Sequence, residues 1–306
     1  MGKIAFVFSG QGAQYPGMGE SLYKISHAAK ELYDNAEKLR PGTMAQSFSG
    51  TKEDLMQTKN TQPCLYLVDL CAALALNERG IFADMATGFS LGEIAALGYS
   101  GAYTPEIGFE IVTKRGECMQ RAGETADTAM AAVLKLDSET IEKVCSEFEH
   151  VYPVNYNSDG QTVVSGLKSE LAQFKEKISQ YPCRVIDLAV SAAFHSPFME
   201  SASKEFADYL KNICTEPPKI PVYANMTAHP YPDNVTELLP QQITKPVQWV
   251  RTIRNMIDAG VTTFIEVGAG KTLCGLIKKI SKDSKIYNVE DAESLEKTVE
   301  AVMKNA

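Results

Sequence analysis

The chain has 306 residues, of which 44% are hydrophobic and 22% are charged, and its formal net charge is −8 at pH 7. This composition excludes a disordered or fibrous protein, and the length allows a large core together with a smaller second unit. The negative charge disfavours nonspecific binding to nucleic acid, and an acidic protein partner would have to meet a local basic patch.

Signals for secretion or membrane insertion are lacking. No apolar run approaches the roughly 20 residues of a membrane span. The start MGKIAFVFSG lacks the basic region, apolar stretch and cleavage site of a signal peptide. The seven cysteines are odd in number and include no C-x-x-C pair, which argues for buried free thiols in a reducing compartment. We therefore expect a cytoplasmic protein that does not contact membranes.

The first predicted elements alternate between strands and helices. The β-branched and aromatic run KIAFVFS at 3–9 predicts a buried strand, which ends at the loop Gly10-Gln11-Gly12. The next predicted elements are a helix over about 61–79, a short strand that reaches residue 89, a helix from residue 90, and a helix over 105–121.

Residues 128–191 form a self-contained pattern. Its segments are the strand TAMAAVLKL, the helix SETIEKVCSEFE, the strands VYPVNY and QTVVSG, the helix KSELAQFKEKIS and the strand CRVIDLAV. The order β-α-β-β-α-β is the ferredoxin-like split arrangement. We predict that 128–191 is a small domain inserted into a larger domain made of 1–127 and 192–306.

Strands and helices alternate again after residue 191, which predicts a mostly parallel sheet covered by helices on both faces. The segment GAGKT at 268–272 is similar to a phosphate-binding loop, but Ile265 stands where that loop requires a glycine. We interpret this segment as a strand-to-helix turn.

The segment ATGFSLGE at 86–93 contains the pattern G-x-S-x-G, with Ser90 between Gly88 and Gly92. A strand before the pattern and a helix after it are the context of a nucleophile elbow, in which the serine oxygen stands above the edge of a sheet. The alternative is a glycine-lined turn with a solvated serine. A nucleophile would need a base, oxyanion donors and a substrate anchor elsewhere in the chain.

The base would be one of four histidines. His27 lies in a polar stretch that we expect to be helical, and His150 ends a predicted helix of the inserted domain, so both are poorly placed. Position leaves the choice open between His195, where the chain returns from the inserted domain, and His229, in a turn-rich segment.

Five segments together resemble one protein family. They are FSGQGAQYPGMG near the start, GFSLGE at 88–93, KRGECMQ at 114–120, AAFHSPFM at 192–199 and KPVQW at 245–249. In order and spacing they are similar to the motifs of the malonyl-CoA:acyl carrier protein transacylase family. The resemblance implies an α/β fold with an α/β-hydrolase-like large domain and an inserted ferredoxin-like domain, in agreement with the periodicity.

The resemblance implies a catalytic role for each matching residue. Ser90 would be the nucleophile and His195 the base of a Ser-His dyad, with the histidine held by the backbone carbonyl of Gln242 instead of a carboxylate. The backbone N–H groups of Gln11 and Leu91 would form the oxyanion hole.

The resemblance also assigns substrate recognition. Arg115 would bind the free carboxylate of the malonyl group, because a planar guanidinium can bind a buried carboxylate through two hydrogen bonds. Leu91 and Phe194 match the malonyl-type pattern, and Phe194 would crowd the methyl branch of methylmalonyl. Gln62, Asn155 and Asn157 match positions near the pantetheine arm.

One residue departs from the family pattern. Phe89 stands where the family usually has a histidine, directly before the nucleophile. The dyad does not depend on this position, so we expect altered substrate contacts while acylation of Ser90 persists.

The sequence therefore predicts an acyltransferase that moves a malonyl group from malonyl-CoA to the phosphopantetheine thiol of acyl carrier protein in fatty-acid biosynthesis. No metal or bound redox cofactor is expected, since the CoA thioester is a substrate, and we expect a monomer. The alternatives are a stand-alone acyltransferase of a polyketide pathway, a serine esterase or thioesterase, and a non-catalytic module that binds a carrier protein. Arg115 and the missing triad acid argue against the esterase.

Overall fold

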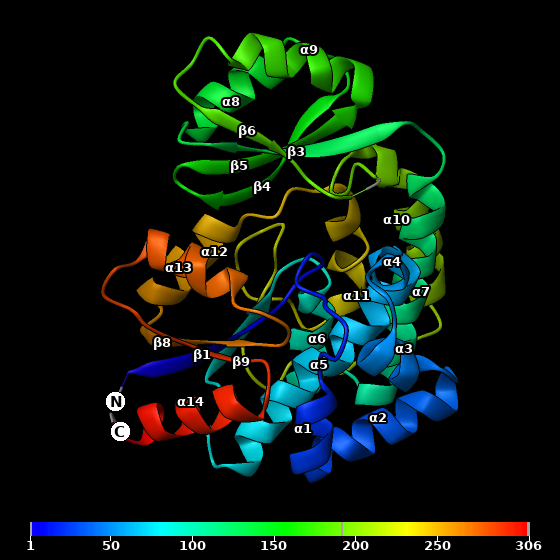
Figure 1. Ribbon diagram of the computed structural model, residues 1–306, viewed down its shortest axis with the longest axis vertical. Helices are drawn as coiled ribbons and strands as arrows, with labels where there is room; N and C mark the ends of the chain where they lie inside the picture. The colour runs from blue at the N-terminus through cyan, green and yellow to red at the C-terminus, as the bar shows by residue number, and fades with distance from the viewer. Residues whose placement is uncertain (1, 191, 305–306) are drawn as a thin grey trace.

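The computed structural model describes residues 2–190 and 192–304. Its strands form a five-stranded sheet in the order β7-β2-β1-β8-β9 and a four-stranded sheet in the order β4-β5-β3-β6 (Figure 1). The large sheet consists of β1 (Lys3–Phe8), β2 (Met85–Gly88), β7 (Val222–Tyr223), β8 (Val261–Val267) and β9 (Lys285–Val289). The small sheet consists of β3 (Thr128–Leu134), β4 (Val151–Ser158), β5 (Gln161–Leu167) and β6 (Arg184–Asp187).

The helices before the small sheet are α1 (Glu20–Ile25), α2 (His27–Leu39), α3 (Thr43–Ser49), α4 (Lys52–Met56), α5 (Thr58–Glu78), α6 (Gly92–Tyr99) and α7 (Pro105–Gly123). Two helices, α8 (Ser138–Cys145) and α9 (Lys168–Ile178), belong to the small sheet. The remaining helices are α10 (Glu200–Leu210), α11 (Val235–Leu238), α12 (Trp249–Asp258), α13 (Thr272–Ile280) and α14 (Ala292–Lys304), with short 3-10 turns at Pro197–Met199 and Gln241–Thr244. None of these helices combines the length and apolarity that crossing a bilayer requires.

The large sheet is parallel in all its described pairings, and its central strand β1 is buried on both faces. Alternate side chains of a strand point to opposite faces. Ala5 and Val7 share a core cluster with α12 and α13, whereas Phe6 and Phe8 share one with α5 and α6. Helices on both faces therefore explain why β1 is continuously apolar.

The small sheet is antiparallel and lies at one end of the molecule, with α8 and α9 on its outer face (Figure 1). Its strand order places β3 and β5 at the centre, as the split β-α-β-β-α-β arrangement requires. The α/β fold class predicted from the sequence is confirmed. The predicted domain boundary at residue 191 lies outside the described residues, and the exact extent of the two domains stays a prediction.

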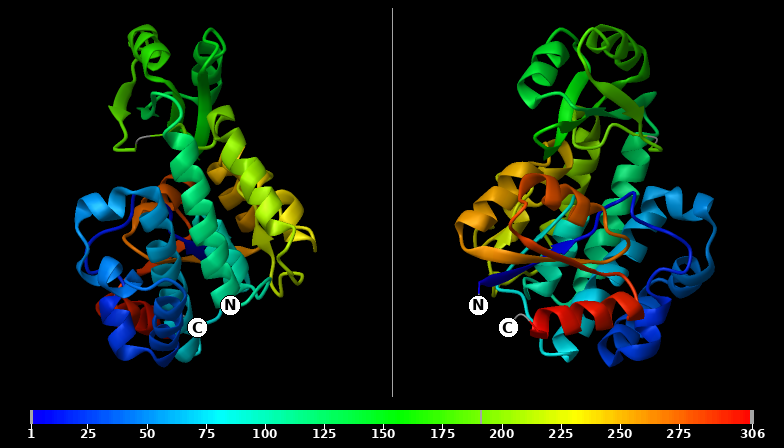
Figure 2. Two further views of the ribbon diagram at one scale, coloured as in Figure 1. Left: turned by 90° about the vertical axis from the view of Figure 1, so that its right-hand side faces the viewer. Right: turned by 60° about the vertical axis from the view of Figure 1, so that its left-hand side comes forward.

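Two connections bring the small sheet against the large part of the molecule. The long helix α7 runs up to it beside α10 (Figure 2). Strand β4 also bonds directly to the segment before α12, where Val247 donates to Val154 O and accepts from the N–H of Tyr156. The small sheet and the large part of the molecule therefore meet along β4.

Several element predictions differ from the structure in detail. The helix expected from residue 90 begins at Gly92, because Ser90 has a positive φ that an α-helix cannot contain. His150 does not end a helix: α8 stops at Cys145, and His150 directly precedes β4. The seven cysteines are all free, as predicted, but not all are buried, because Cys214 is exposed and Cys183 and Cys274 are half-buried.

Candidate active site

The turn between β2 and α6 requires glycine on both sides of Ser90. A Cβ at Gly88 would lie 1.9 Å from the backbone carbon of Gly92, and a Cβ at Gly92 would lie 2.4 Å from Phe8 O. Ser90 itself has φ 55°, a left-handed conformation that costs a non-glycine residue about 1–3 kcal/mol. The glycines of G-x-S-x-G are therefore needed for close backbone packing, and the turn is a sharp strand-to-helix elbow.

His195 meets Ser90 across this elbow. Its Nε2 lies 2.8 Å from Ser90 Oγ, and its Nδ1 lies 2.9 Å from Gln242 O and 3.2 Å from Lys245 O. Both carbonyls can only accept, so Nδ1 carries the hydrogen. Nε2 is then free to accept the hydroxyl proton of Ser90.

The protonation state of His195 also suits a base. Burial, and then the positive charge of Arg115, lower the pKa of His195 to about 4. Both effects disfavour a second positive charge in a site from which water is excluded. The imidazole is therefore neutral at pH 7.

Arg115 is fully buried, with an exposed fraction of 0%. Its Nη1 donates to Gln62 Oε1 at 2.9 Å, and its Nη2 donates to Gln242 Oε1 at 2.7 Å and Ser90 Oγ at 3.2 Å. Burial lowers its pKa to about 10, so it remains a cation at pH 7. All these hydrogen bonds go to neutral groups, and its Nε has no partner among the described residues. A buried cation with this set of partners, beside a serine hydroxyl, is suited to bind an anion.

Gln242 links the three groups. Its carbonyl accepts from His195, its Oε1 accepts from Arg115, and its Nε2 donates to Ser90 O at 2.7 Å. The sequence assigned only the backbone carbonyl to the site. The side chain was missed because no local pattern relates residue 242 to an arginine 127 positions earlier.

Gln62 is buried, with an exposed fraction of 1%, and its side chain contacts Arg115 and Met119. It therefore orients the guanidinium. Its expected place near the pantetheine arm stays a prediction.

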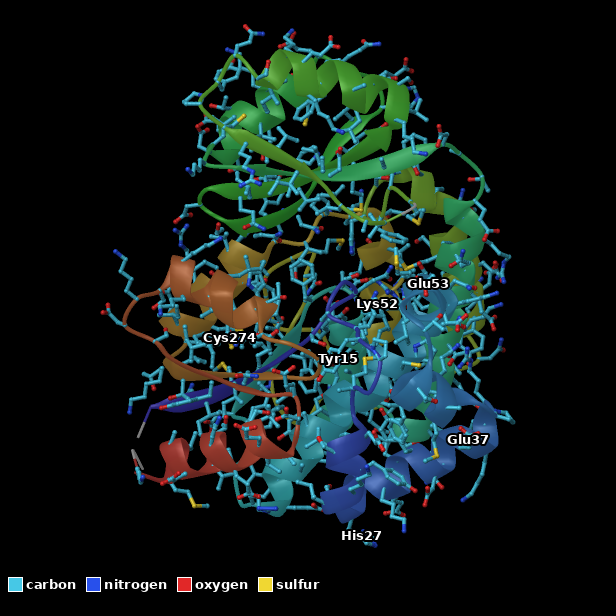
Figure 3. All side chains as sticks on the ribbon, in the orientation of Figure 1. Tyr15, His27, Glu37, Lys52, Glu53 and Cys274 are labelled. Carbon is cyan, nitrogen blue, oxygen red and sulfur yellow. The ribbon has the colours of Figure 1, made fainter. Side chains whose placement is uncertain are left out.

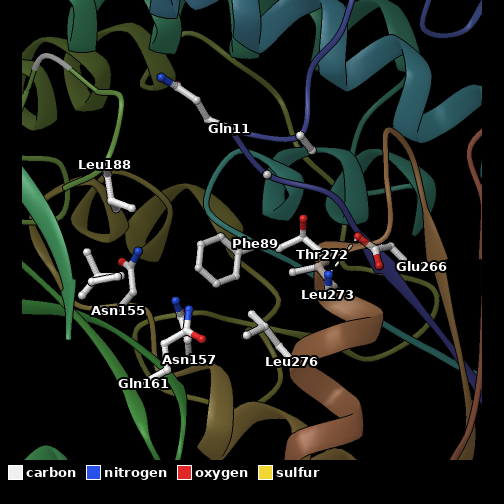
Figure 4. Close-up of a pocket in the computed structure, with 15 residues that line it drawn as sticks. Gln11, Phe89, Asn155, Asn157, Gln161, Leu188, Glu266, Thr272, Leu273 and Leu276 are labelled. Carbon is white, nitrogen blue, oxygen red and sulfur yellow. Dashed lines mark hydrogen bonds between the residues drawn. The ribbon is translucent and has the colours of Figure 1, made fainter. Parts of the chain in front are cut away.

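Two adjoining cavities open beside the dyad. The inner one contains Ser90, Phe194 and His195, together with Met119, Met130 and Val190. The outer one runs between β4, β5 and α13 and includes Asn157, Gln161, Leu273 and Leu276 (Figure 4). The two share Gln11, Phe89, Asn155 and Leu188, so together they form one path to the nucleophile.

Phe89 forms a wall of this path. Figure 4 shows its ring between Asn155 and Asn157 on one side and Leu276 of α13 on the other. The ring packs against Trp249 in a T-shaped contact, with centroids 5.4 Å apart. Phe89 is therefore held by the core of the large domain while it borders both cavities.

Several polar groups around the path have no protein partner. Asn155 Oδ1 and Asn157 Oδ1 are buried and unbonded within the described part of the chain. The N–H groups of Gln11, in the loop after β1, and of Leu91, directly after Ser90, bond to no acceptor among residues 2–190 and 192–304. These groups can bind a ligand without first breaking a protein hydrogen bond.

The other histidines lie away from the site. His27 begins α2 at the far end of the molecule (Figure 3), and His229 is exposed beside Arg251. His150 bonds to Glu170 on α9. The choice that the sequence left open between His195 and His229 is thereby decided by distance to Ser90.

Comparison with known proteins identifies the family. The chain matches the acyl transferase domain family over residues 5–303. The malonyl CoA-acyl carrier protein transacylase of Bacillus subtilis (strain 168) is 38% identical over 315 aligned positions, which cover 99% of this chain and 98% of that protein. The chain belongs to the malonyl-CoA:acyl carrier protein transacylase family.

Solved structures of transacylases agree with this assignment. The one from Clostridium perfringens Atcc 13124 has a TM-score of 0.95 and 36% identity, covering 99% of this chain and 98% of its own. A malonyl-transacylase in complex with a type II polyketide synthase acyl carrier protein has a TM-score of 0.93 and 30% identity, covering 98% and 99%. The family and the acyltransferase class predicted from five motifs are confirmed.

One polar cluster of this chain had no sequence signal beyond its position next to the elbow. Glu93, in the first turn of α6, is fully buried and accepts hydrogen bonds from Tyr231 Oη and from the backbone N–H of Asn225. Burial raises the pKa of Glu93 to about 7. Its partners are more than 130 residues away in the chain, so only the folded structure reveals them.

Proposed function

We propose that this protein transfers a malonyl group from malonyl-CoA to the phosphopantetheine thiol of acyl carrier protein through a Ser90 ester. The observation that carries the proposal is the buried, charged Arg115, bonded only to neutral groups, with Nη2 3.2 Å from the nucleophile. An esterase for neutral substrates has no use for such a cation, because an unneutralised buried charge is costly. A carboxylate one carbon away from the reacting carbonyl would supply the anionic hydrogen-bond partner that the guanidinium lacks.

The first half-reaction forms the acyl-enzyme. Ser90 Oγ attacks the thioester carbon while its proton passes to His195 Nε2, and the N–H groups of Gln11 and Leu91 stabilise the oxyanion. When the intermediate collapses, the C–S bond breaks, and His195 gives the proton to the CoA sulfur. The neutral imidazole and malonyl-Ser90 remain.

The second half-reaction reverses these steps with a different thiol. His195 removes the proton of the pantetheine thiol, and the sulfur attacks the Ser90 ester carbonyl. The C–O bond then breaks, and the proton returns to Ser90 Oγ. Atoms and charge balance without a metal or a redox cofactor, and the proposal requires none.

The outer cavity would hold the pantetheine arm. The two amide groups of pantetheine need hydrogen-bond partners in a buried channel. The unbonded Oδ1 atoms of Asn155 and Asn157 can accept from their N–H groups. Phe194, at the inner cavity, would crowd a methyl branch on the acyl carbon and so favour malonyl over methylmalonyl.

The central experiment is intact mass spectrometry after brief mixing with malonyl-CoA, acetyl-CoA or methylmalonyl-CoA, without carrier protein. We expect a malonyl adduct on the Ser90 peptide, absent in Ser90→Ala and strongly reduced in His195→Ala. His229→Ala, which removes an exposed histidine, is the matched control and should load normally. No adduct with any donor in excess would refute the proposal.

A chase experiment separates the transferase from a thioesterase. Holo-acyl carrier protein should discharge malonyl-Ser90 much faster than buffer does, whereas a thioesterase would lose the adduct equally fast in buffer.

We assign the enzyme to fatty-acid biosynthesis. We also assign it to the cytoplasm and expect it to act as a monomer. Because one similar structure contains a polyketide carrier protein, the chase should compare carrier proteins of both pathways. Faster discharge by the polyketide carrier would overturn the pathway assignment.

A further inference from the structure

Strand β7 ends beside the nucleophile elbow. β2 pairs in parallel with β7, with Thr87 opposite Tyr223. Two residues further along both strands, Asn225 comes opposite Phe89. The regular backbone ladder has already stopped there, because β7 contains only two residues.

The side chain of Asn225 continues this ladder in place of its backbone. Its Oδ1 accepts from the N–H of Ser90 at 2.7 Å, and its Nδ2 donates to Gly88 O at 2.6 Å. In a parallel ladder, the N–H of a residue donates to the carbonyl of the residue that precedes its opposite partner. The carbonyl of the same residue accepts from the N–H of the residue that follows that partner. The carboxamide offers one donor and one acceptor, as a peptide group does, and so forms that rung opposite Phe89.

The backbone of Asn225 is fixed at the same time by other partners. Its N–H donates to Glu93 Oε2 at 2.6 Å, and its carbonyl accepts from the N–H of Gln248 at 2.8 Å. Tyr231 Oη donates to the other oxygen of Glu93. Asn225 is 1% exposed and Glu93 is 0% exposed, so water cannot replace these bonds.

This rung holds the part of the elbow that carries strain. Ser90 has φ 55°, and its backbone N–H points toward β7, away from the helix that follows. We propose that Asn225, clamped by Glu93, is a positioning residue that keeps Ser90 in its left-handed conformation, so that Oγ meets His195 Nε2 and the incoming thioester. The inference rests on the proposed function, since it concerns the acylation of the same serine.

Three variants separate positioning from folding. Asn225→Ala removes both side-chain hydrogen bonds of the rung. Asn225→Asp keeps the shape: the protonated carboxyl can donate to Gly88 O and accept from Ser90, whereas the ionised form offers only acceptors. Asn255→Ala is the matched control, because Asn255 Nδ2 bonds to Ala228 O in the turn after β7 and does not contact the elbow.

The first measurement is the first-order rate of Ser90 malonylation at saturating malonyl-CoA. The second is half-saturation, the malonyl-CoA concentration at which this rate is half-maximal. Loss of alignment by about 1 Å costs about 100-fold in rate. We therefore expect Asn225→Ala to load about 100-fold more slowly with half-saturation within about twofold, since Arg115 is untouched. Asn255→Ala should load at the wild-type rate.

The pH profile of Asn225→Asp gives a signature that a purely structural role would not. The ionisable groups around the new carboxyl are Glu93 on α6, Tyr231 after β7, Arg115 on α7 and His195. Burial beside Glu93 raises the pKa of such a carboxyl, so the active, protonated form is lost as pH rises. Loading should fall at least about tenfold between about pH 5.5 and 8.5, and more steeply than in the wild type, in which His195 stays neutral and Glu93 titrates in this range.

Thermal unfolding of each variant at each pH, and labelling of Ser90 by a fluorophosphonate probe, complete the test. Slow loading and slow labelling of a folded Asn225→Ala, or the falling pH profile of Asn225→Asp, support the inference. Wild-type loading rates in both variants, or losses that track unfolding at every pH, overturn it. Failure of the wild type to load with malonyl would instead refute the proposed function, and the fluorophosphonate rates would still test the role of Asn225.

Discussion

Replacement of Arg115 by methionine tests the origin of malonyl selectivity most directly. The substitution removes the cation while it retains much of the side-chain volume, which limits collapse of the fully buried site. It deletes the guanidinium that lies 3.2 Å from Ser90 Oγ and leaves the contact between Ser90 and His195 intact. The acetyl group has no carboxylate and so reports on the dyad alone.

The structure sets the expected magnitude. Removing one partner of a buried, hydrogen-bonded charge pair costs about 2–5 kcal/mol. At the 1.36 kcal/mol that corresponds to a factor of ten, a cost of about 3 kcal/mol lowers the rate of malonyl loading about 150-fold. Acetyl loading should change by no more than about fivefold, since acetyl gains nothing from the guanidinium.

The assay is quenched-flow mixing with a mixture of malonyl-CoA and acetyl-CoA, followed by mass spectrometry of the Ser90 peptide. Arg121→Ala is the matched control, because Arg121 lies on the same helix, is exposed and pairs with Glu205. An equal fall in malonyl and acetyl loading would refute the reasoning. Arg115 would then support the dyad without recognising the carboxylate.

Three further predictions follow from the surroundings of the dyad. Malonyl loading should be lost as pH falls through about 4, the pKa of His195. Because burial and the charge of Arg115 both lower this pKa, Arg115→Met should shift the loss of loading to higher pH. A pH–rate profile in which Arg115→Met and the wild type lose activity at the same pH would contradict the effect of Arg115 on His195. The pKa of Glu93 is raised from 4.5 to about 7, so its contribution to stability is complete below 4.5 and is lost as pH rises through 7. The difference in Tm between the wild type and Glu93→Gln should therefore change in favour of Glu93→Gln as pH rises from about 5 to 8. A Tm difference that stays constant over this range would exclude titration of Glu93 there. Phe89→His should keep malonyl preference, change the loading rate less than about tenfold and lower Tm by loss of the contact with Trp249; abolished loading would show that the site depends on the phenyl ring.

The sequence predicted those elements of the fold whose apolar residues recur with a clear period. The buried strand at 3–9 and the helices near 61–79 and 105–121 correspond to β1, α5 and α7 within three residues at each end. Of the four helices between Glu20 and Met56, the sequence predicted only the helical stretch around His27, which is α2. The four helices are 5 to 13 residues long, so each offers few turns of periodic pattern, and they are stabilised by packing against α5 instead.

The candidate site was predictable where a role depends on local geometry. Gly88 and Gly92 are needed by the turn itself, so their spacing identified the elbow around Ser90. The side chains of Gln242 and Asn225 were not predictable, because each bonds to the elbow from more than 130 positions away and neither belongs to a local turn motif there.

The charge distribution also accounts for the absence of a carboxylate behind His195 in the described structure. A carboxylate at Nδ1 would lie close to Arg115, which already contacts Ser90 and Gln242, and it would compete with the substrate for the guanidinium. The carbonyls of Gln242 and Lys245 fix the same tautomer of His195 without adding a negative charge. A triad acid would thus strengthen the base at the expense of the anion site. Carbonyls at Nδ1 allow a neutral base and a cation without a carboxylate hydrogen-bond partner to face one serine.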